Sequence, residues 1–445
     1  MFSQTSIVTP LQQWVGEKTG LLSSLNPHTL EQYQFLRLRE QLYYAHSHSL
    51  YYSRRLEGLD IERITERASL PLLPLTPDQA LREEPQKLLC ISGGEAQRVT
   101  TLNTSGSSGD TKRVWFSPSD LDRTVDFFAR GMATMVGPGK TALVLLSGNT
   151  PDSLGDLLSR ALIGMGVKAI IHGPVRDMAA ALDATKKADC IIGLPVQLNR
   201  LCLASCANKV GDGSVRPATV LLTADYVPQG IINNIQNLWG SEVFTHYGMT
   251  ESGFGLAVQC YAHEALHLRD AEFIIEIVDP ASGQPLPDGQ WGELVLTSLC
   301  NEAMPLIRYR TGDITRRIVG PCSCGGTLPR LDKVKGRISG IAQKYPIHAL
   351  DEALFLLPGL LDYHANVLDD NGLDLVLDGL STYSEEELRL TLKAQGLEPP
   401  ALKFRKEALP VFGGPSKRRI WGLGDEEDLL QGHRGTGERG NKTTK

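Results

Sequence analysis

A loop of small hydroxyl residues and glycines, TSGSSGDTK at residues 104–112, has the composition of a phosphate-binding loop. Glycines let the backbone approach an anion closely, and consecutive N–H and OH groups can donate hydrogen bonds to phosphate oxygens. Lys112 adds a point charge. The spacing is not that of the GxxxxGK[ST] loop, and a flexible Ser/Gly linker is the alternative interpretation. The candidate phosphate ligands are Thr104, Ser105, Gly106, Ser107, Gly109 and Lys112.

A second polar motif, HYGMTE, follows directly on the apolar run EVFT. Ligands of parallel sheets lie where strands end, so these side chains are candidates for contact with a ligand. Glu251 beside a phosphate site is a suitable ligand for Mg²⁺, and Tyr247 could stack on a purine. An ordinary polar strand end is the alternative. The candidate residues are His246, Tyr247, Gly248, Met249, Thr250 and Glu251.

Two further segments carry charge in glycine turns. RYRTGD ends in Asp313, a carboxylate that can accept hydrogen bonds from both ribose hydroxyls of a nucleotide. Its alternative is a surface turn with a salt bridge. Gly336-Arg337 comes next, and the basic segment GGPSKRR, which contains Lys417, lies near the end of the chain. Taken alone, that last segment is typical of a solvated basic turn.

Four cysteine and histidine residues have the types and spacing of a zinc site. Cys260 and His267 are close in sequence, and Cys322 and Cys324 form a CxC in a Gly/Pro loop. Three thiolates and one imidazole would complete a closed tetrahedral Zn²⁺ site of structural role. His263 is the rival fourth ligand, and reduced, metal-free side chains are the alternative to a site.

The elements that must position these residues alternate between strand and helix. From 119 to 246, short apolar runs such as TALVLLSG and ATVLLT are separated by helical patterns, with Ser119 as the expected N-cap of the first helix. This predicts an α/β fold with a parallel sheet layered with helices. After about 255, β-type runs joined by Gly/Pro/Asp turns predict an antiparallel or β-barrel-like subdomain.

The predicted domains are an N-terminal domain at 1–336, a mobile α+β domain at 338–424 and a disordered tail at 425–445. The chain has 445 residues, 41% hydrophobic and 22% charged, which is ordinary for a soluble globular protein. Its net charge of -6 disfavours a nucleic-acid partner. We read no signal peptide and no spanning segment, so the expected location is cytoplasmic, without a membrane partner.

The order and spacing of these motifs resemble the adenylate-forming superfamily, and most closely its phenylacetate–CoA ligase branch. The resemblance rests on TSGSSGDTK, HYGMTE, RYRTGD, the CSCGG…PRL…KGR segment and GGPSKRR, and it spans residues 65–420. The cysteine and histidine set is similar to that of the zinc-containing members of this branch. It implies that Thr104, Ser105, Ser107 and Lys112 grip the ATP phosphates, that Glu251 holds Mg²⁺ and that Thr250 contacts the α-phosphate.

The resemblance also implies that Tyr247 lines the adenine pocket and that Asp313, with Arg337 nearby, binds the ribose. Asp225 lies in TAD, where the family has a GGE-like adenine wall. Lys417 would bridge the substrate carboxylate and the α-phosphate. The family pattern is Gly-Lys with an arginine three residues on, whereas Pro415 and Ser416 precede Lys417 here, and under another register the lysine position holds Pro415. The stretch after Arg337 also lacks the acidic hinge residue of the family.

The implied activity is that of an ATP-dependent carboxylate–CoA ligase. A small carboxylic acid, expected to be an aryl or arylacetic acid, would become acyl-AMP with release of pyrophosphate, and coenzyme A would then accept the acyl group. The cofactors would be ATP, Mg²⁺, coenzyme A and structural Zn²⁺, and a homodimer is expected. One alternative is an adenylating enzyme that loads a separate carrier protein. The other is a catalytically degenerate homologue that binds nucleotide.

Overall fold

The computed structural model describes residues 9–103, 111–207, 216–341, 343–410 and 420–421. The described chain divides into two compact units, one reaching to Lys344 and the other beginning at Tyr345. The expected disordered tail lies outside the described residues. Within the described residues, no helix has both the length and the apolar character needed to cross a membrane.

A mixed sheet forms the centre of the first unit. Its parallel part has the order β7-β6-β5-β3-β4, and its antiparallel extension continues from β7 through β8, β9 and β14 to β13. The central strands β5 and β6 are short, fully buried apolar runs, as a sheet covered on both faces requires, whereas the edge strand β4 is partly exposed. The bounds are β3 (Thr141–Val144), β4 (Lys168–Ile171), β5 (Cys190–Gly193), β6 (Thr219–Leu222), β7 (Glu242–Tyr247), β8 (Ala257–Gln259), β9 (Leu266–Leu268), β13 (Arg317–Ile318) and β14 (Arg330–Leu331).

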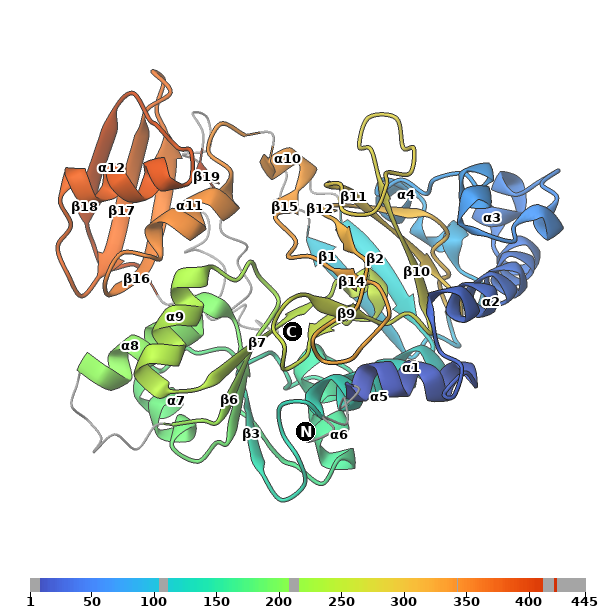
Figure 1. Ribbon diagram of the computed structural model, residues 1–445, viewed down its shortest axis with the longest axis horizontal. Helices are drawn as coiled ribbons and strands as arrows, with labels where there is room; N and C mark the ends of the chain where they lie inside the picture. The colour runs from blue at the N-terminus through green and yellow to red at the C-terminus, as the bar shows by residue number, and fades with distance from the viewer. Residues whose placement is uncertain (1–8, 104–110, 208–215, 342, 411–419, 422–445) are drawn as a thin grey trace, which may run out of the picture. The chain divides into compact units, whose positions relative to one another are not determined.

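Helices cover both faces of the parallel strands, which confirms the predicted α/β architecture. In Figure 1, α8 and α9 lie on one side of β6 and β7, and α5 and α6 lie on the other. The helices are α5 (Pro118–Met132), α6 (Leu154–Gly164), α7 (Met178–Thr185), α8 (Pro195–Ala207) and α9 (Gln229–Trp239).

The N-cap of α5 lies two residues before the expected one. Ser117, not Ser119, caps it: the Ser117 side chain accepts from the backbone N–H of Asp120, and the Asp120 side chain accepts from the backbone N–H of Ser117. Pro118 occupies the first helical position, where its missing N–H costs nothing. The prediction of Ser119 was wrong because both serines have an aspartate three residues on, so the local pattern does not separate them, and the structure forms the capping box at Ser117 and Asp120.

The second sheet of the first unit is antiparallel, in the order β10-β11-β12-β15. Among the described strands it is an open four-stranded sheet, so the expected barrel-like closure is not formed. The N-terminal helices pack against it, and Gln34 of α2 donates hydrogen bonds to the carbonyls of Asp270 and Phe273. The strands are β10 (Phe273–Val278), β11 (Gly292–Ser298), β12 (Tyr309–Thr315) and β15 (Gly336–Arg337).

The remaining elements of the first unit are a hairpin, the long helix α2 and several shorter helices. The hairpin pairs β1 (Arg98–Asn103) with β2 (Thr111–Phe116). The helices are α1 (Pro10–Thr19), α2 (Pro27–His48), α3 (Leu50–Arg55), α4 (Ala80–Glu83), α10 (Ile338–Ile341), and the 3₁₀ turns η1 (Ile61–Arg63), η2 (Arg67–Leu72), η3 (Pro85–Leu88) and η4 (Thr250–Ser252).

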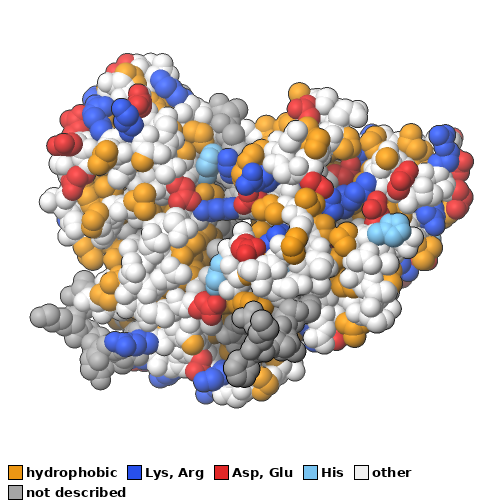
Figure 2. Space-filling view, viewed as in Figure 1, with side chains coloured by type: hydrophobic (Ala, Val, Ile, Leu, Met, Phe, Trp, Pro, Cys, Tyr) orange, Lys and Arg blue, Asp and Glu red, His pale blue; other side chains and the backbone are white. Residues whose placement is uncertain are grey.

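The second unit is a small α+β fold. Its sheet has the order β18-β17-β16-β19, and its helices are α11 (Ile347–Leu354) and α12 (Glu385–Ala394). Figure 2 shows Lys and Arg side chains mixed with Asp and Glu over this unit, in line with ion pairs such as Arg389–Glu385. The strands are β16 (Leu360–Val367), β17 (Leu373–Gly379), β18 (Leu402–Lys406) and β19 (Ile420–Trp421).

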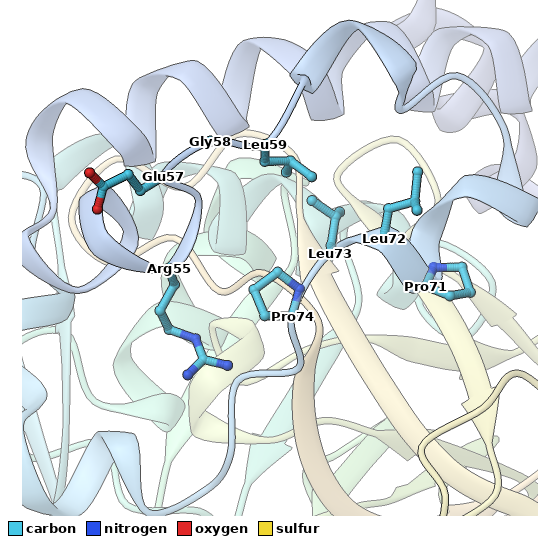
Figure 3. Close-up of a pocket in the computed structure, with 8 residues that line it drawn as sticks. All are labelled: Arg55, Glu57, Gly58, Leu59, Pro71, Leu72, Leu73 and Pro74. Atoms are coloured by element: carbon cyan, nitrogen blue, oxygen red, sulfur yellow. The ribbon is translucent and has the colours of Figure 1, made fainter.

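A hollow of about 380 Å³ lies between the end of α3 and η2. Figure 3 shows its apolar wall of Leu59, Leu72 and Leu73, with the Glu57 carboxylate pointing away from it. None of the motif residues lines this hollow, and we assign it no role in the chemistry.

Candidate active site

The HYGMTE motif turns sharply where β7 ends. A side chain at Gly248 would place its Cβ 2.1 Å from the carbonyl oxygen of Phe254, so only glycine fits this close approach. The turn leads into η4, whose central residue, Glu251, is buried. The motif therefore carries a carboxylate from the carboxyl edge of the parallel sheet back into the protein.

Glu251 meets a buried cluster that also contains Lys112, Tyr309 and Asp78. The Lys112 ammonium lies 3.2 Å from Glu251 Oε1 and forms an ion pair with Asp78. It also donates to the Tyr309 hydroxyl at 3.1 Å. That hydroxyl lies 3.0 Å from Glu251 Oε1 and 2.9 Å from Asp78 Oδ1, so it can donate to either carboxylate. One buried cation thus stands between two carboxylates.

Burial and the neighbouring charges set the ionisation of this cluster. Burial alone would raise the pKa of Asp78, but the hydrogen bond and charge of Lys112, with the Tyr309 hydrogen bond and the Arg82 charge, hold that pKa below its ordinary value. Burial, followed by the charges of Glu251 and Asp78, raises the pKa of Tyr309 well above its ordinary value. The phenol therefore stays protonated and remains a hydrogen-bond donor.

Asp78 and Tyr309 were missed by the sequence analysis as site residues. Thr76 forms a parallel bridge to Tyr309: its N–H donates to the carbonyl of Arg308, and its own carbonyl accepts from the N–H of Arg310, both at 2.9 Å. This bridge brings Asp78 beside β12. Neither residue carries a local signal, because the contact joins segments more than 230 residues apart.

A second group gathers around Asp313 in β12. The Tyr247 hydroxyl donates to Asp313 Oδ2 at 2.7 Å, and Arg337 Nε lies 3.4 Å from Asp313 Oδ1. Strand β15 pairs with β12 so that Arg337 lies opposite Asp313. Gly312, the residue before Asp313, has a φ of 75°, a conformation that favours glycine. Burial, followed by the charge of Asp313, raises the pKa of Tyr247 well above its ordinary value.

The two arginines of RYRTGD have structural roles instead. Arg308 makes a buried two-point ion pair with Glu276, at 3.0 and 2.8 Å. Arg310 pairs with Glu293. In β12, Tyr309 and Asp313 are therefore the motif side chains that reach the site.

The other predicted site residues have different placements. His246, Met249 and Thr250 lie at the strand end and η4 with Glu251, and Asp225 follows β6 at the same sheet edge, after Ala224 in the uncommon left-handed region at φ 68°. The remaining predicted residues, Thr104, Ser105, Gly106, Ser107, Gly109 and Lys417, lie outside the described residues. The hairpin does pair Asn103 with Thr111, so both ends of the 104–110 segment are held next to Lys112.

The predicted cysteine and histidine set comes together in the first unit. The ligand atoms of Cys260, His267, Cys322 and Cys324 all lie within 4.8 Å of one another, and all four residues are buried. The Cys260 and Cys322 sulfurs are 3.8 Å apart, far beyond a disulfide bond. Cys324 Sγ lies 3.5 Å from His267 Nε2.

Two thiolates at about 2.3 Å from one tetrahedral ion would be about 3.8 Å apart, so the spacing fits zinc. Burial lowers the pKa of His267 to about 4, which keeps the imidazole in the neutral form that a metal requires. The rival ligand, His263, does not join the cluster. Its Nε2 lies 2.9 Å from Glu242 Oε1, and its ring packs on Phe244.

Known proteins resemble this chain in sequence and in fold. No family model matches the chain. A phenylacetate-coenzyme A ligase of Thermus thermophilus is 26% identical over 366 residues, covering 79% of this chain and 81% of that protein. The Escherichia coli phenylacetate-coenzyme A ligase is 27% identical, covering 69% of this chain and 71% of its own.

Among solved structures, a 2-hydroxyisobutyryl-CoA ligase in its postadenylation state has a TM-score of 0.78 at 19% identity, covering 92% of this chain and 93% of its own. A benzoate CoA ligase from Burkholderia xenovorans has a TM-score of 0.51 at 15% identity, covering 72% and 66%. The fold is that of the adenylate-forming ligases. Within that class, the relatives in sequence are phenylacetate–CoA ligases, which confirms the resemblance carried by the motifs.

Proposed function

We propose that this protein is an ATP-dependent carboxylate–CoA ligase. One observation carries the proposal: three motifs separated by up to two hundred residues converge on the same sheet edge. Lys112, Glu251 and Tyr309 form one contact group there, and Tyr247 joins Asp313 beside it. The relatives in sequence are phenylacetate-coenzyme A ligases, which supports the same activity.

In the proposed first step, a substrate carboxylate oxygen bonds to the α-phosphorus of ATP, and the bond to the β-phosphate oxygen breaks. The products are acyl-AMP and pyrophosphate. Lys112 can offset phosphate charge, and Asp313 can accept hydrogen bonds from the ribose. In the second step, the thiol of coenzyme A attacks the acyl carbon, AMP leaves, and the thiol proton passes to solvent. Positioning and charge neutralisation supply most of the acceleration in such transfers.

Glu251 and Asp78 are the residues that would hold Mg²⁺. They fit the ion because the buried Glu251 and the half-buried Asp78 share one protein cation, and oxygen ligands are those that magnesium prefers. When bound, the ion would neutralise charge on the phosphates of ATP. Lys112 would then be released from its carboxylate partners to contact phosphate oxygens.

Pyrophosphate exchange across a panel of carboxylic acids, with and without coenzyme A, tests the activity. We expect acid-dependent exchange without coenzyme A and thioester with it. Acyl-AMP without thioester would instead favour the carrier-protein alternative. Tight ATP binding with no exchange for any acid would show a degenerate homologue and contradict the proposal.

We further propose that Cys260, His267, Cys322 and Cys324 hold a structural zinc ion. The four ligand atoms are buried and lie at distances suited to a tetrahedral ion. The site would join the segment after β8 to the loop between β13 and β14. All four positions are filled by protein, which leaves none for a reactive water.

Metal analysis of the purified protein tests the site. We expect about one zinc per chain, and a clear loss of metal and of melting temperature in Cys324→Ser. Cys206→Ser is the matched control, because Cys206 is exposed and lies outside the cluster. Zinc far below one per chain in the unaltered protein would refute the proposal.

A further inference from the structure

A small apolar pocket lies directly beside the candidate nucleotide site, within the first unit. Helices α5 and α6 form one wall, and the ends of β5, β6 and β7 form the other. His246, which lines the pocket, is adjacent in sequence to Tyr247, whose hydroxyl reaches Asp313. In parallel sheets, substrates bind beyond the carboxyl ends of the strands, so this pocket is placed to receive the acyl group of the acid.

The pocket has room for only a small group. Its volume is about 30 Å³. One water-sized sphere needs about 10–15 Å³, whereas a cavity that binds benzene measures about 150 Å³. Two or three water-sized groups therefore fit, and an aromatic ring does not.

The wall at Phe127 is held firmly in place. Its ring packs edge-on against Trp14 at 6.1 Å, and the Arg269 guanidinium lies 5.0 Å from its centre on another side. Gly255 approaches so closely that an added Cβ would lie 2.6 Å from the ring. Swinging Phe127 aside would break several contacts at once, so the pocket cannot widen cheaply in this direction.

One polar atom in the lining lacks a partner. His246 Nδ1 lies 2.9 Å from Thr223 Oγ1, but its Nε2 is buried without a hydrogen bond. Burial lowers the pKa of His246 to about 4, so the ring is neutral. A buried unpaired nitrogen costs stability unless a ligand satisfies it.

A hydroxyl is the small group that matches this nitrogen in either tautomer, because it both donates and accepts. A substrate ammonium does not match, since the lining offers it no carboxylate and burying an unpaired charge is costly. Resting on the proposed function, we propose that the substrate is a short-chain hydroxy acid whose hydroxyl group bonds His246 Nε2 in this pocket. This differs from the aryl or arylacetic acid suggested by the sequence resemblance.

Acid-dependent pyrophosphate exchange tests the inference with butanoate, 2-hydroxybutanoate, 3-hydroxybutanoate and phenylacetate. We expect kcat/KM for one hydroxybutanoate to exceed that for butanoate at least about tenfold, with phenylacetate below both. Phenylacetate as the best substrate, or butanoate equal to both hydroxy acids, would overturn the inference and leave the ligase activity standing. No exchange with any acid would overturn both.

Two pairs of variants locate the effect. In His246→Leu, the preference for the hydroxy acid over butanoate should fall to about one, because no buried nitrogen is left to satisfy. The control is His172→Leu, which changes a histidine outside the pocket and should keep the preference.

Met132→Ala enlarges the pocket and should raise kcat/KM for phenylacetate relative to butanoate about tenfold. Its control, Met135→Ala, makes the same change outside the lining and should leave this ratio unchanged. Unchanged ratios in His246→Leu and Met132→Ala would show that the acyl group binds elsewhere.

Discussion

At the scale of single residues, the contact group of Lys112, Asp78, Tyr309 and Glu251 is the least replaceable part of the site. A buried ammonium shared by two carboxylates is stable only because the charges and hydrogen bonds satisfy one another. The Tyr309 hydroxyl completes this arrangement, since it accepts from Lys112 and can donate to either carboxylate. Removing the hydroxyl keeps the aromatic ring but breaks its hydrogen bonds to Lys112 and the carboxylates.

We therefore expect Tyr309→Phe to lower kcat/KM for ATP about tenfold. A hydrogen bond to a charged group contributes about 1.5–3 kcal/mol, and its loss lets Lys112 and the carboxylates shift. Steady-state pyrophosphate release at varied ATP measures the effect.

The matched control is Tyr363→Phe. Tyr363 also donates to a buried carboxylate, Asp351, at 2.6 Å, but it lies in the second unit. Both Tyr→Phe variants should lose about 1–3 kcal/mol of unfolding free energy, because each loses one buried hydrogen bond. In Tyr363→Phe, kcat/KM for ATP should change little. Equal activity losses in the two variants would mean that Tyr309 acts through general stability alone.

At the scale of elements, α5 connects local sequence to the site. Its buried face carries Phe127, Phe128 and Met132, which form one wall of the acyl pocket. Its first turn is anchored by Asp120, whose carboxylate accepts from the backbone N–H groups of Glu302 and Ala303 near β11. The start of the helix therefore determines where the pocket wall lies.

Ser117→Ala should lower the unfolding free energy by about 1 kcal/mol, because the helix loses its N-cap. Ser117 also donates to Glu302 at 2.8 Å, so the cost should lie at the upper end of such values. Urea denaturation at equilibrium measures it. Ser119→Ala removes a partly buried hydrogen bond from Arg123 and leaves the cap intact, so it should cost less. A larger loss for Ser119→Ala would contradict the capping seen here.

At the scale of the whole molecule, the chain consists of two compact units, and the nucleotide candidates described here belong to the first. The predicted catalytic lysine, Lys417, is outside the described residues; in sequence it precedes β19, which pairs with β16 in the second unit. The participation of Lys417 in acyl-AMP formation stays a prediction, as do the homodimer and the cytoplasmic location.

Lys417→Ala should reduce acyl-AMP formation at least about a hundredfold while ATP binding is nearly retained. The reason is that a cation bridging the carboxylate and α-phosphate acts mainly on charge that develops in the transition state. Single-turnover formation of acyl-AMP and equilibrium ATP binding separate the two effects. Lys406→Ala, on exposed β18, is the control. Unaltered adenylation in Lys417→Ala would reassign the catalytic cation.

The sequence by itself determined what depends on near neighbours along the chain. Alternating apolar runs and helical patterns predicted the α/β fold, because periodicity within ten to twenty residues follows from burial of one face. The order and spacing of the motifs also indicated the adenylate-forming ligases, and the sequence named three cysteines and His267 as a candidate zinc site, with His263 as the rival fourth ligand.

Only the tertiary structure decided which distant groups meet. A backbone bridge at Thr76 brings Asp78 next to Tyr309. His267, and not His263, lies with the three cysteines. The antiparallel sheet β10-β11-β12-β15, expected to be barrel-like, is open. The tertiary structure also encloses His246 Nε2 without a partner in a pocket too small for a ring. Such outcomes depend on packing between segments far apart in sequence, and local residue patterns carry no information about that packing.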